Sequence, residues 1–261
     1  MSRTRIIYYC DELNDEFSTA RITPKPIDGR YVYFHGSKFK AFTHFFWYRI
    51  VATPLAFLYT RLGFDHRIMN REILSPYKKT GYFMYGNHTQ DIGDACIPSM
   101  LNFPKQNYVI AHPNNVSMPF LGRITPSLGA IPLPDGMEAY GNFIRAIEKR
   151  IGEGHTVVIY PEAHIWPFYT GIRPFPDTSF HYPVKYNVPC FCFTNTYHKR
   201  RFGKKPRIVT YIDGPFYPDN SLPIKERKRE LRDRVYAAMC ERARLSDVEY
   251  IKYVKREEKD G

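Results

Sequence analysis

Cysteine is sparse in this sequence of 261 residues and is never spaced as a metal-binding pair. The cysteines are an odd, scattered set of five without a C-x-x-C pair, namely Cys10, Cys96, Cys190, Cys192 and Cys240. A structural zinc site of the usual kind is therefore excluded. We expect reduced thiols in a cytosolic environment.

Long apolar runs are also missing. No stretch reaches the about 18 uncharged apolar residues that a bilayer-spanning helix needs, and the charged N-terminus lacks the apolar core of a secretory signal. The nearest candidate is 39–64, where Arg49 and Arg61 flank an uncharged stretch and Trp47 stands among many Phe and Tyr residues. This pattern favours a helix pair in the headgroup region of a membrane, with an ordinary buried core helix as the alternative.

Aromatic and basic residues are abundant instead. Aromatics make up 16% of the chain, with 21 Tyr and 19 Phe, and 38 Lys and Arg against 26 Asp and Glu leave a formal charge of +12. The hydrophobic fraction of 43% and charged fraction of 25% are ordinary for a globular protein, and the length fits one domain. Such a charge favours polyanionic partners, namely nucleic acid, acidic lipid or a phosphorylated substrate.

Short apolar runs alternate with helical patterns through most of the chain. We expect strands at 82–85, 108–111, 156–160, 190–193 and 208–212, and helices at 95–101, 137–152 and 224–243. This alternation predicts an α/β fold with a mixed, largely parallel sheet flanked by helices, and an N-terminal membrane-interface helical segment. The expected regions are a polar segment at 1–38, the aromatic-rich segment at 39–75, an α/β domain at 76–245 and a charged tail at 246–261.

A histidine and two carboxylates follow the first expected strand of this domain. His88 comes directly after the strand, with Asp91 three and Asp94 six residues later. A histidine beside an acid that fixes its tautomer is a candidate general base. Either acid could reach the ring if the turn is helical, and the plainer interpretation is that one of them only caps the following helix.

A second polar group follows the strand at 156–160. Pro161 and Glu162 come first, then His164, and Arg173 stands a few residues later. Together these side chains could hold a phosphorylated polyol, although Arg173 could equally be a surface ion-pair partner and His164 an ordinary loop histidine. Glu162 is the hardest to dismiss, because a carboxylate that closes an apolar run is costly without a role.

Two further blocks complete an ordered set. One is Met118, Pro119, Phe120, Leu121, Gly122 and Arg123, leading to the glycine-led strand at 129–133, and the other is the proline-opened strand at 188–193. Together with Asn87–His88–Asp94 and Pro161–Glu162, these blocks over roughly 80–215 resemble the glycerolipid acyltransferase family, typified by 1-acylglycerol-3-phosphate acyltransferase.

Each of the first three blocks departs from the family pattern. The family has four residues between the histidine and the aspartate, whereas five separate His88 from Asp94, so Asp91 stays open although we favour Asp94. The arginine that usually follows the glycine-led strand is absent, and Arg123 is the candidate replacement. The family motif P-E-G-T-R keeps only its first two residues here, and Arg173 is the candidate for its arginine.

The resemblance implies direct acyl transfer. His88, assisted by the acid, would deprotonate a hydroxyl of a lysophospholipid or glycerol phosphate, which attacks the thioester of acyl-CoA or acyl carrier protein. Asn87, Arg123, Glu162, His164 and Arg173 would bind substrate. No cofactor or metal is needed, and no G-x-S-x-G elbow offers a serine nucleophile. The implied location is peripheral or monotopic, on the cytoplasmic face of a membrane with an anionic surface.

Two other classes of protein stay open. A metal-dependent hydrolase would use His88, Asp91, Asp94, Glu162 and His164 as ligands. A non-enzymatic protein that binds anionic membranes would need only the charge and the aromatics. Nucleic acid is the least favoured partner, since no recognised nucleic-acid-binding signature is present.

Overall fold

The structure is a computed structural model and describes residues 4–18, 22–33, 37–119 and 121–256. Phe120, in the second block of the family pattern, lies outside the described residues. None of the described helices is both long enough and apolar enough to cross a membrane.

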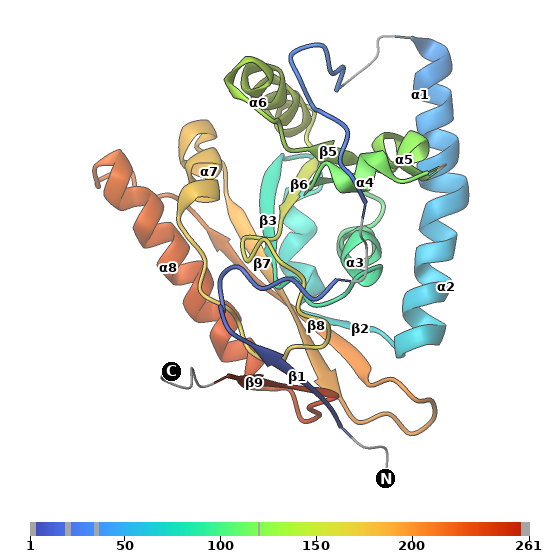
Figure 1. Cartoon of the computed structure of the whole chain (residues 1–261). Helices are drawn as coiled ribbons and strands as arrows, with labels where there is room; N and C mark the ends of the chain where they lie inside the picture. The colour runs from blue at the N-terminus through green and yellow to red at the C-terminus, as the bar shows by residue number, and fades with distance from the viewer. Residues whose placement is uncertain (1–3, 19–21, 34–36, 120, 257–261) are drawn as a thin grey trace, which may run out of the picture.

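A seven-stranded sheet forms the centre of the molecule (Figure 1). In spatial order its strands are β2 (Arg67–Met69), β8 (Arg207–Phe216), β7 (Cys190–His198), β3 (Tyr82–Gly86), β6 (Thr156–Ile159), β4 (Asn107–Ala111) and β5 (Ala130–Pro132). The β7–β8 pair is antiparallel and the other pairs are parallel. The prediction of a mixed, largely parallel sheet flanked by helices is therefore confirmed.

Helices cover both faces of the sheet, as the central strand β3 requires. Its side chains alternate between two apolar clusters, with Phe83 and Tyr85 in one and Tyr82 and Met84 in the other. The first cluster includes residues of α6 (Met137–Gly152), α7 (His181–Tyr186) and α8 (Ile224–Ala243), and the second includes residues of α2 (Thr53–Phe64) and α3 (Gly93–Leu101). A strand buried on both faces is typical of a parallel sheet in an α/β protein.

Up to Phe64, the aromatic-rich segment is one continuous helical rod, where the sequence favoured a helix pair (Figure 1). It consists of α1 (Lys38–Phe45), a π-helical segment (Phe46–Ala52) and α2. The N–H of Thr53 donates to the carbonyl of Tyr48, five residues back. Pro54 follows and has no N–H to offer, and the chain remains helical through the wider π-helical turn into α2.

The two ends of the described chain pair with each other. β1 (Arg5–Tyr9) and β9 (Ile251–Lys255) form a parallel two-stranded sheet. These strands fall within the regions expected as a polar segment and a charged tail. Each is only five residues long and finds its partner at the other end of the chain, which local patterning does not reveal.

The remaining elements are short connections. They are a 3-10 helix (Arg71–Tyr77), α4 (Asn114–Ser117), α5 (Leu121–Ile124) and two more 3-10 helices (Thr125–Leu128 and Thr178–Phe180). The segment at 22–33 is fixed against α6 and the loop before it, because Asp135 accepts a hydrogen bond from the N–H of Ile27 and Asn142 donates to the carbonyl of Gly29.

Candidate active site

The candidate site lies at the carboxyl ends of β3 and β6, which are parallel neighbours. Asn87 and His88 follow β3, and Tyr160 and Glu162 follow β6. Adjacent parallel strands bring the residues after their carboxyl ends to one edge of the sheet, where α/β proteins bind ligands. Strand order therefore brings the first and third blocks of the sequence together.

His88 and Asp94 form a hydrogen-bonded pair. The Nδ1–H of His88 donates to Oδ2 of Asp94 over 2.7 Å, because an ionised carboxylate can only accept. The His88 ring stacks on Tyr160 with centroids 4.5 Å apart and planes 17° apart. The side chain of His88 keeps 18% of its surface exposed, and no described residue hydrogen-bonds to its Nε2. Nε2 is thus left without a partner among the described residues, as a general base requires.

The carboxylate of Asp94 is buried in the first turn of α3. It accepts from the N–H of Gln90 as well as from His88, and its Oδ1 has no hydrogen-bond partner among the described residues. Burial raises the pKa of Asp94, and the hydrogen bond from His88 opposes that rise. The N-terminal end of a helix also favours a negative charge. These contacts hold an ionised Asp94 against the imidazole.

Asp91, the other candidate acid, is exposed and has no hydrogen bond to a described residue. The pKa of its carboxyl is raised, first by partial burial and then by the nearby charge of Glu16. His88 lowers that pKa, so the two groups sense each other electrostatically. In this structure the contact with the imidazole belongs to Asp94.

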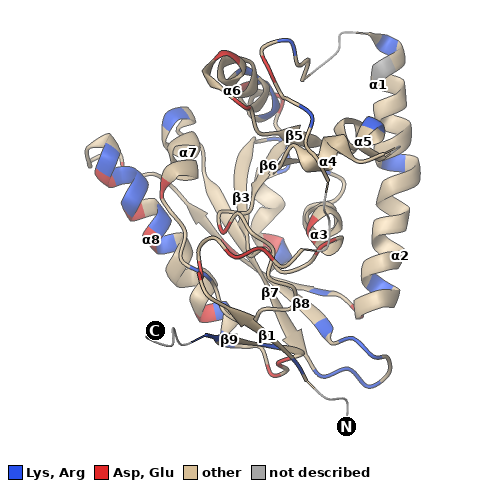
Figure 2. Cartoon of the chain, viewed as in Figure 1, with Lys and Arg blue, Asp and Glu red and all other residues tan. Residues whose placement is uncertain are grey.

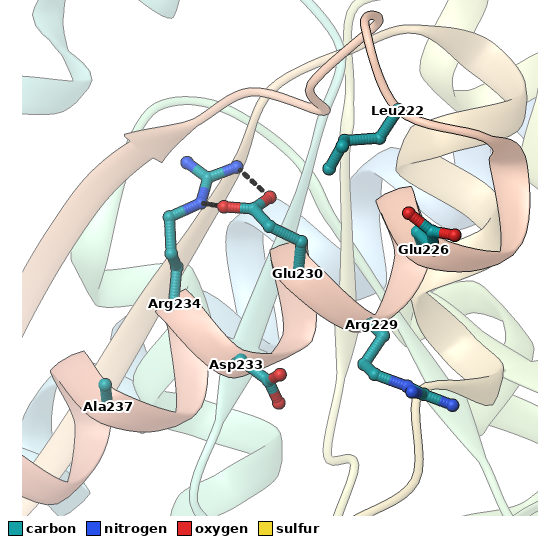
Figure 3. A pocket seen from close by; sticks show the side chains of 7 residues that line it. All are labelled: Leu222, Glu226, Arg229, Glu230, Asp233, Arg234 and Ala237. Carbon is teal, nitrogen blue, oxygen red and sulfur yellow. Dashed lines mark hydrogen bonds and ion pairs between the residues drawn. The ribbon is translucent and has the colours of Figure 1, made fainter.

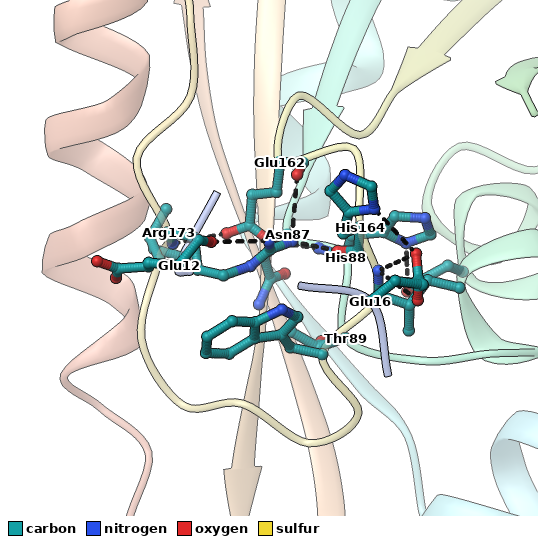
Figure 4. Close-up of polar contacts among 12 residues, drawn as sticks. Glu12, Glu16, Asn87, His88, Thr89, Glu162, His164 and Arg173 are labelled. Carbon is teal, nitrogen blue, oxygen red and sulfur yellow. Dashed lines mark hydrogen bonds and ion pairs between the residues drawn. The ribbon is translucent and has the colours of Figure 1, made fainter. Parts of the chain in front are cut away.

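Glu162, which follows β6, links the loop after that strand to His88, which follows β3. Its carboxylate accepts from the backbone N–H of His88 (3.0 Å) and of Arg173 (2.9 Å), and it lies between those two residues (Figure 4). The Arg173 guanidinium is 3.6 Å from the carboxylate, and both side chains are at most 1% exposed. Burial raises the pKa of Glu162, which Arg173 opposes. Glu162 therefore fixes the backbone that carries His88.

Arg173 is buried, and two of its three guanidinium nitrogens have hydrogen-bond partners, whereas its Nε has none among the described residues. Its guanidinium donates to the backbone carbonyls of Glu12, Glu162 and His164, and it lies 4.9 Å from the ring centre of Trp166. Sequence reasoning made it a substrate-binding replacement for the family arginine. The structure places it as the partner of Glu162 and as the support of the loop after β6.

The other predicted substrate contacts are spread out. Asn87 is buried and exchanges two hydrogen bonds with the backbone of Asn195, which extends the β3–β7 pairing by one residue. His164 pairs with Glu16 across 3.2 Å. Arg123 is exposed on α5 and is hydrogen-bonded to no described residue. Arg123 is therefore the one of these three residues that carries a charge and has no hydrogen bond to a described residue.

Three residues of the site were missed by sequence reasoning. Tyr160 stacks on His88, and its position directly before Pro161 was a signal that could have been used. Trp166 donates its backbone N–H to the carbonyl of His88, and its ring packs on Phe17. Glu16 accepts from His164 and from the N–H of Ile165. Nothing local in the sequence reveals the contacts of Trp166 and Glu16.

The chemistry available at this edge is that of a general base. Burial raises the pKa of the nearby Cys96 thiol to about 11, so it is not a thiolate at neutral pH. In the described part of the chain, no three His, Cys, Asp or Glu side chains gather in a way that could hold a metal ion. The ligand set that a metal-dependent hydrolase would need is divided, since Glu162 holds backbone amides and His164 pairs with Glu16.

A separate hollow lies on α8 and carries no comparable chemistry (Figure 3). It is lined by Leu222, Glu226, Arg229, Glu230, Asp233, Arg234 and Ala237. Arg234 donates to Glu230 four residues earlier over 2.8 Å, a pairing that is typical of a solvated helix face.

Comparison with known proteins identifies the fold. No protein-family model matches the chain, and no curated protein does. Among solved structures, it is similar to the 1-acyl-sn-glycerophosphate (LPA) acyltransferase PlsC from Thermotoga maritima, with a TM-score of 0.57 and 18% identity. The match covers 80% of this chain and 89% of that one. The chain thus has an acyltransferase fold, on evidence that is independent of the motif resemblance.

Proposed function

We propose that this protein is an acyltransferase that moves a fatty acyl group from a thioester to a hydroxyl of a lysophospholipid or glycerol phosphate. The observation that carries the proposal is the His88–Asp94 pair, 2.7 Å apart, at the carboxyl edge of a sheet whose fold matches an acyltransferase. Acyl-CoA or acyl carrier protein is the acyl donor, and no cofactor enters the reaction.

In the proposed reaction, Nε2 of His88 takes the proton of the acceptor hydroxyl while that oxygen attacks the thioester carbonyl carbon. The C–S bond then breaks, and the thiol leaves with the proton that His88 returns. Asp94 stabilises the imidazolium between these steps. General-base help of this kind contributes about 10²- to 10⁴-fold in rate, and the rest comes from positioning and oxyanion stabilisation.

The backbone amides around His88 have a limited part in oxyanion stabilisation. The N–H of His88 already donates to Glu162, and the N–H of Gln90 donates to Asp94. These two groups therefore hold the catalytic pair in place and are not donors to the oxyanion. Arg123 is the proposed contact for the acceptor phosphate, because its guanidinium is exposed.

A membrane is the proposed location of the reaction, with the helical rod against its cytoplasmic surface. Large apolar side chains, each at least 48% exposed, cover the outer surface of the rod: Phe39, Phe42, Phe45, Ile50, Leu55, Phe57, Leu58 and Leu62. Exposed apolar surface of this extent is typical of a membrane or protein contact. α2 packs on α3, and Asp91 and Asp94 both raise the pKa of Tyr59 in α2. The rod therefore lies beside the candidate site.

The test is an acceptor panel assayed with labelled acyl-CoA and acyl carrier protein, in detergent or vesicles. The wild-type chain is expected to acylate a lysophospholipid or glycerol phosphate, and His88→Ala is expected to lower turnover by about 10²- to 10⁴-fold. His44→Ala is the matched control, because this histidine lies on the rod. Full activity of His88→Ala, or no acylation of any acceptor, would refute the proposal.

A further inference from the structure

The hairpin between β7 and β8 carries a cluster of positive charge with an aromatic side chain at its centre. Residues 199–205 read KRRFGKK and contain no acidic residue. Phe202 is 73% exposed, and the Arg201 guanidinium lies 5.2 Å from its ring centre. Figure 2 shows the hairpin as a basic loop next to the end of α2. An exposed phenylalanine among five basic residues has no role in the fold's core.

The hairpin is fixed to the end of the helical rod. Arg200 donates to the backbone carbonyls of Leu62 (2.8 Å) and Gly63 (2.6 Å), the last turn of α2. Arg207, just after the hairpin, pairs with Asp65 across 2.5 Å. These contacts satisfy the helix end and set the direction in which the hairpin projects.

Apolar and basic groups meet at this junction. Leu62 and Phe202 line one concavity together with the four arginines Arg61, Arg200, Arg201 and Arg207, and the single acid there is Asp65. Leu62 is also part of the outer surface of the rod. The hairpin therefore continues the rod's apolar surface and adds positive charge to it.

We infer that the β7–β8 hairpin is a second membrane contact, which recognises the anionic headgroups of a phospholipid bilayer. Phe202 enters the interface beside the rod, while Arg201, Lys204 and Lys205 contact lipid phosphates. A bilayer explains both the exposed ring and the charge, whereas a soluble phosphate compound explains only the charge. The inference rests on the proposed membrane location of the enzyme and adds a preference for anionic lipid.

The basic stretch of α8 provides the contrast. It carries six Lys and Arg residues between Lys225 and Arg234, as many as the segment from Lys199 to Arg207, but Glu226, Glu230 and Asp233 are interspersed among them. Lys228 pairs with Asp177 and Arg234 with Glu230. α8 also lies on the opposite side of the sheet from the rod (Figure 1). Its charge is therefore partly offset by neighbouring acids and does not face the same surface.

Vesicle binding of the full-length chain tests the inference. The probes are vesicles of phosphatidylcholine alone and vesicles with about 30 mole per cent phosphatidylglycerol, a composition that carries a negative surface potential. The triple variant Arg201→Gln/Lys204→Gln/Lys205→Gln should bind the anionic vesicles about 100-fold more weakly, since each basic residue at the surface contributes roughly a fivefold factor. Its binding to phosphatidylcholine vesicles, which depends on the rod, should not change.

A triple variant at two positions of α8 and at Arg244, the residue directly after it, is the matched control. Lys225→Gln/Arg229→Gln/Arg244→Gln removes the same charge from exposed positions and should keep the preference for anionic vesicles. Phe202→Ser should weaken binding to both kinds of vesicle about tenfold, because it removes an apolar contact and leaves the charge.

Three results would overturn the inference. They are an unchanged anionic preference in the hairpin variant, an equal loss in the α8 variant, and a loss of free CoA binding by the hairpin variant with vesicle binding intact. Binding requires no turnover, so these outcomes are separate from the proposed activity. A chain that binds vesicles as expected but transfers no acyl group would refute the proposed function alone.

Discussion

The edge of the sheet that carries His88 and the helical rod both depend on aromatic side chains, but they use them in opposite ways. At the sheet edge, Trp166 is completely buried and contacts Arg173 and Tyr253. On the rod, Phe42 and Phe57 are 64% and 56% exposed. The high aromatic content of the chain therefore has two separate causes. One is a rigid support for polar chemistry, and the other is an apolar outer surface.

The charged groups of the two regions also differ in burial. Glu162 and Asp94 are buried, and each accepts two hydrogen bonds that fix the residues around His88. The charged groups of the rod, such as Arg61, lie at the surface. If the two regions have separate roles, variants at the sheet edge should change turnover or stability, and variants of the rod should change membrane binding.

The largest effect is expected at Asp94. Asp94→Asn should lower turnover by about 10²- to 10⁴-fold, because the imidazolium loses its charged partner. Asp91→Asn is the control, and its turnover should stay within a few-fold of the wild-type value. Vesicle binding should be unchanged in both. Comparable losses in the two variants would mean that Asp91 shares the role.

Asp94→Asn should also change how the stability of the protein depends on pH. Burial raises the pKa of Asp94, so the folded state binds this proton more tightly than the unfolded state does. The contribution of Asp94 to stability therefore decreases as the pH rises from its ordinary pKa through the raised one. Chemical denaturation at neutral pH should find the inactive variant no less stable than wild type, and its stability should fall less over that pH range.

Glu162 should affect stability most. Glu162→Ala leaves Arg173 buried without its carboxylate and should lower the free energy of unfolding by about 3–5 kcal/mol, as measured in urea. The double variant Glu162→Gln/Arg173→Met, which removes both charges at similar volume, should recover most of that loss. If the free energy of unfolding of Glu162→Ala lay within about 1 kcal/mol of the wild-type value, the pair would not support the loop.

The next largest effect is expected on membrane binding, from variants of the rod. Phe42→Ser/Phe57→Ser should weaken binding to phosphatidylcholine vesicles by about tenfold or more, because each exposed ring contributes apolar area to the interface. The midpoint of thermal unfolding and turnover on detergent-dispersed substrate should stay near wild type. A large loss of stability would instead indicate that these rings pack within the fold.

The smallest effect is expected at Glu16. Glu16→Gln removes a partly exposed partner of His164 and should lower stability by less than about 1 kcal/mol. Turnover should fall only slightly, because Trp166 and Arg173 still hold the loop after β6. A loss of turnover as large as that of Asp94→Asn would place Glu16 in the reaction itself.

The main helices and the central strands could be predicted from the sequence because their signals are local. α6 and α8 have the predicted bounds, and β3 extends the predicted strand by one residue. Strands β1, β2 and β9 were not expected. They are three to five residues long and depend on distant partners, so their own residues carry little signal.

The sequence by itself determined the alternation of strands and helices and the positions of His88, Asp94 and Glu162 after strand ends, because periodicity and turn residues act over a few residues. The tertiary structure alone decided that Asp94 contacts the imidazole, that Arg173 is buried against Glu162, and that the hairpin joins the rod. These outcomes depend on strand order and on contacts between residues far apart in the chain. They are set by packing across the whole domain, which local sequence does not encode.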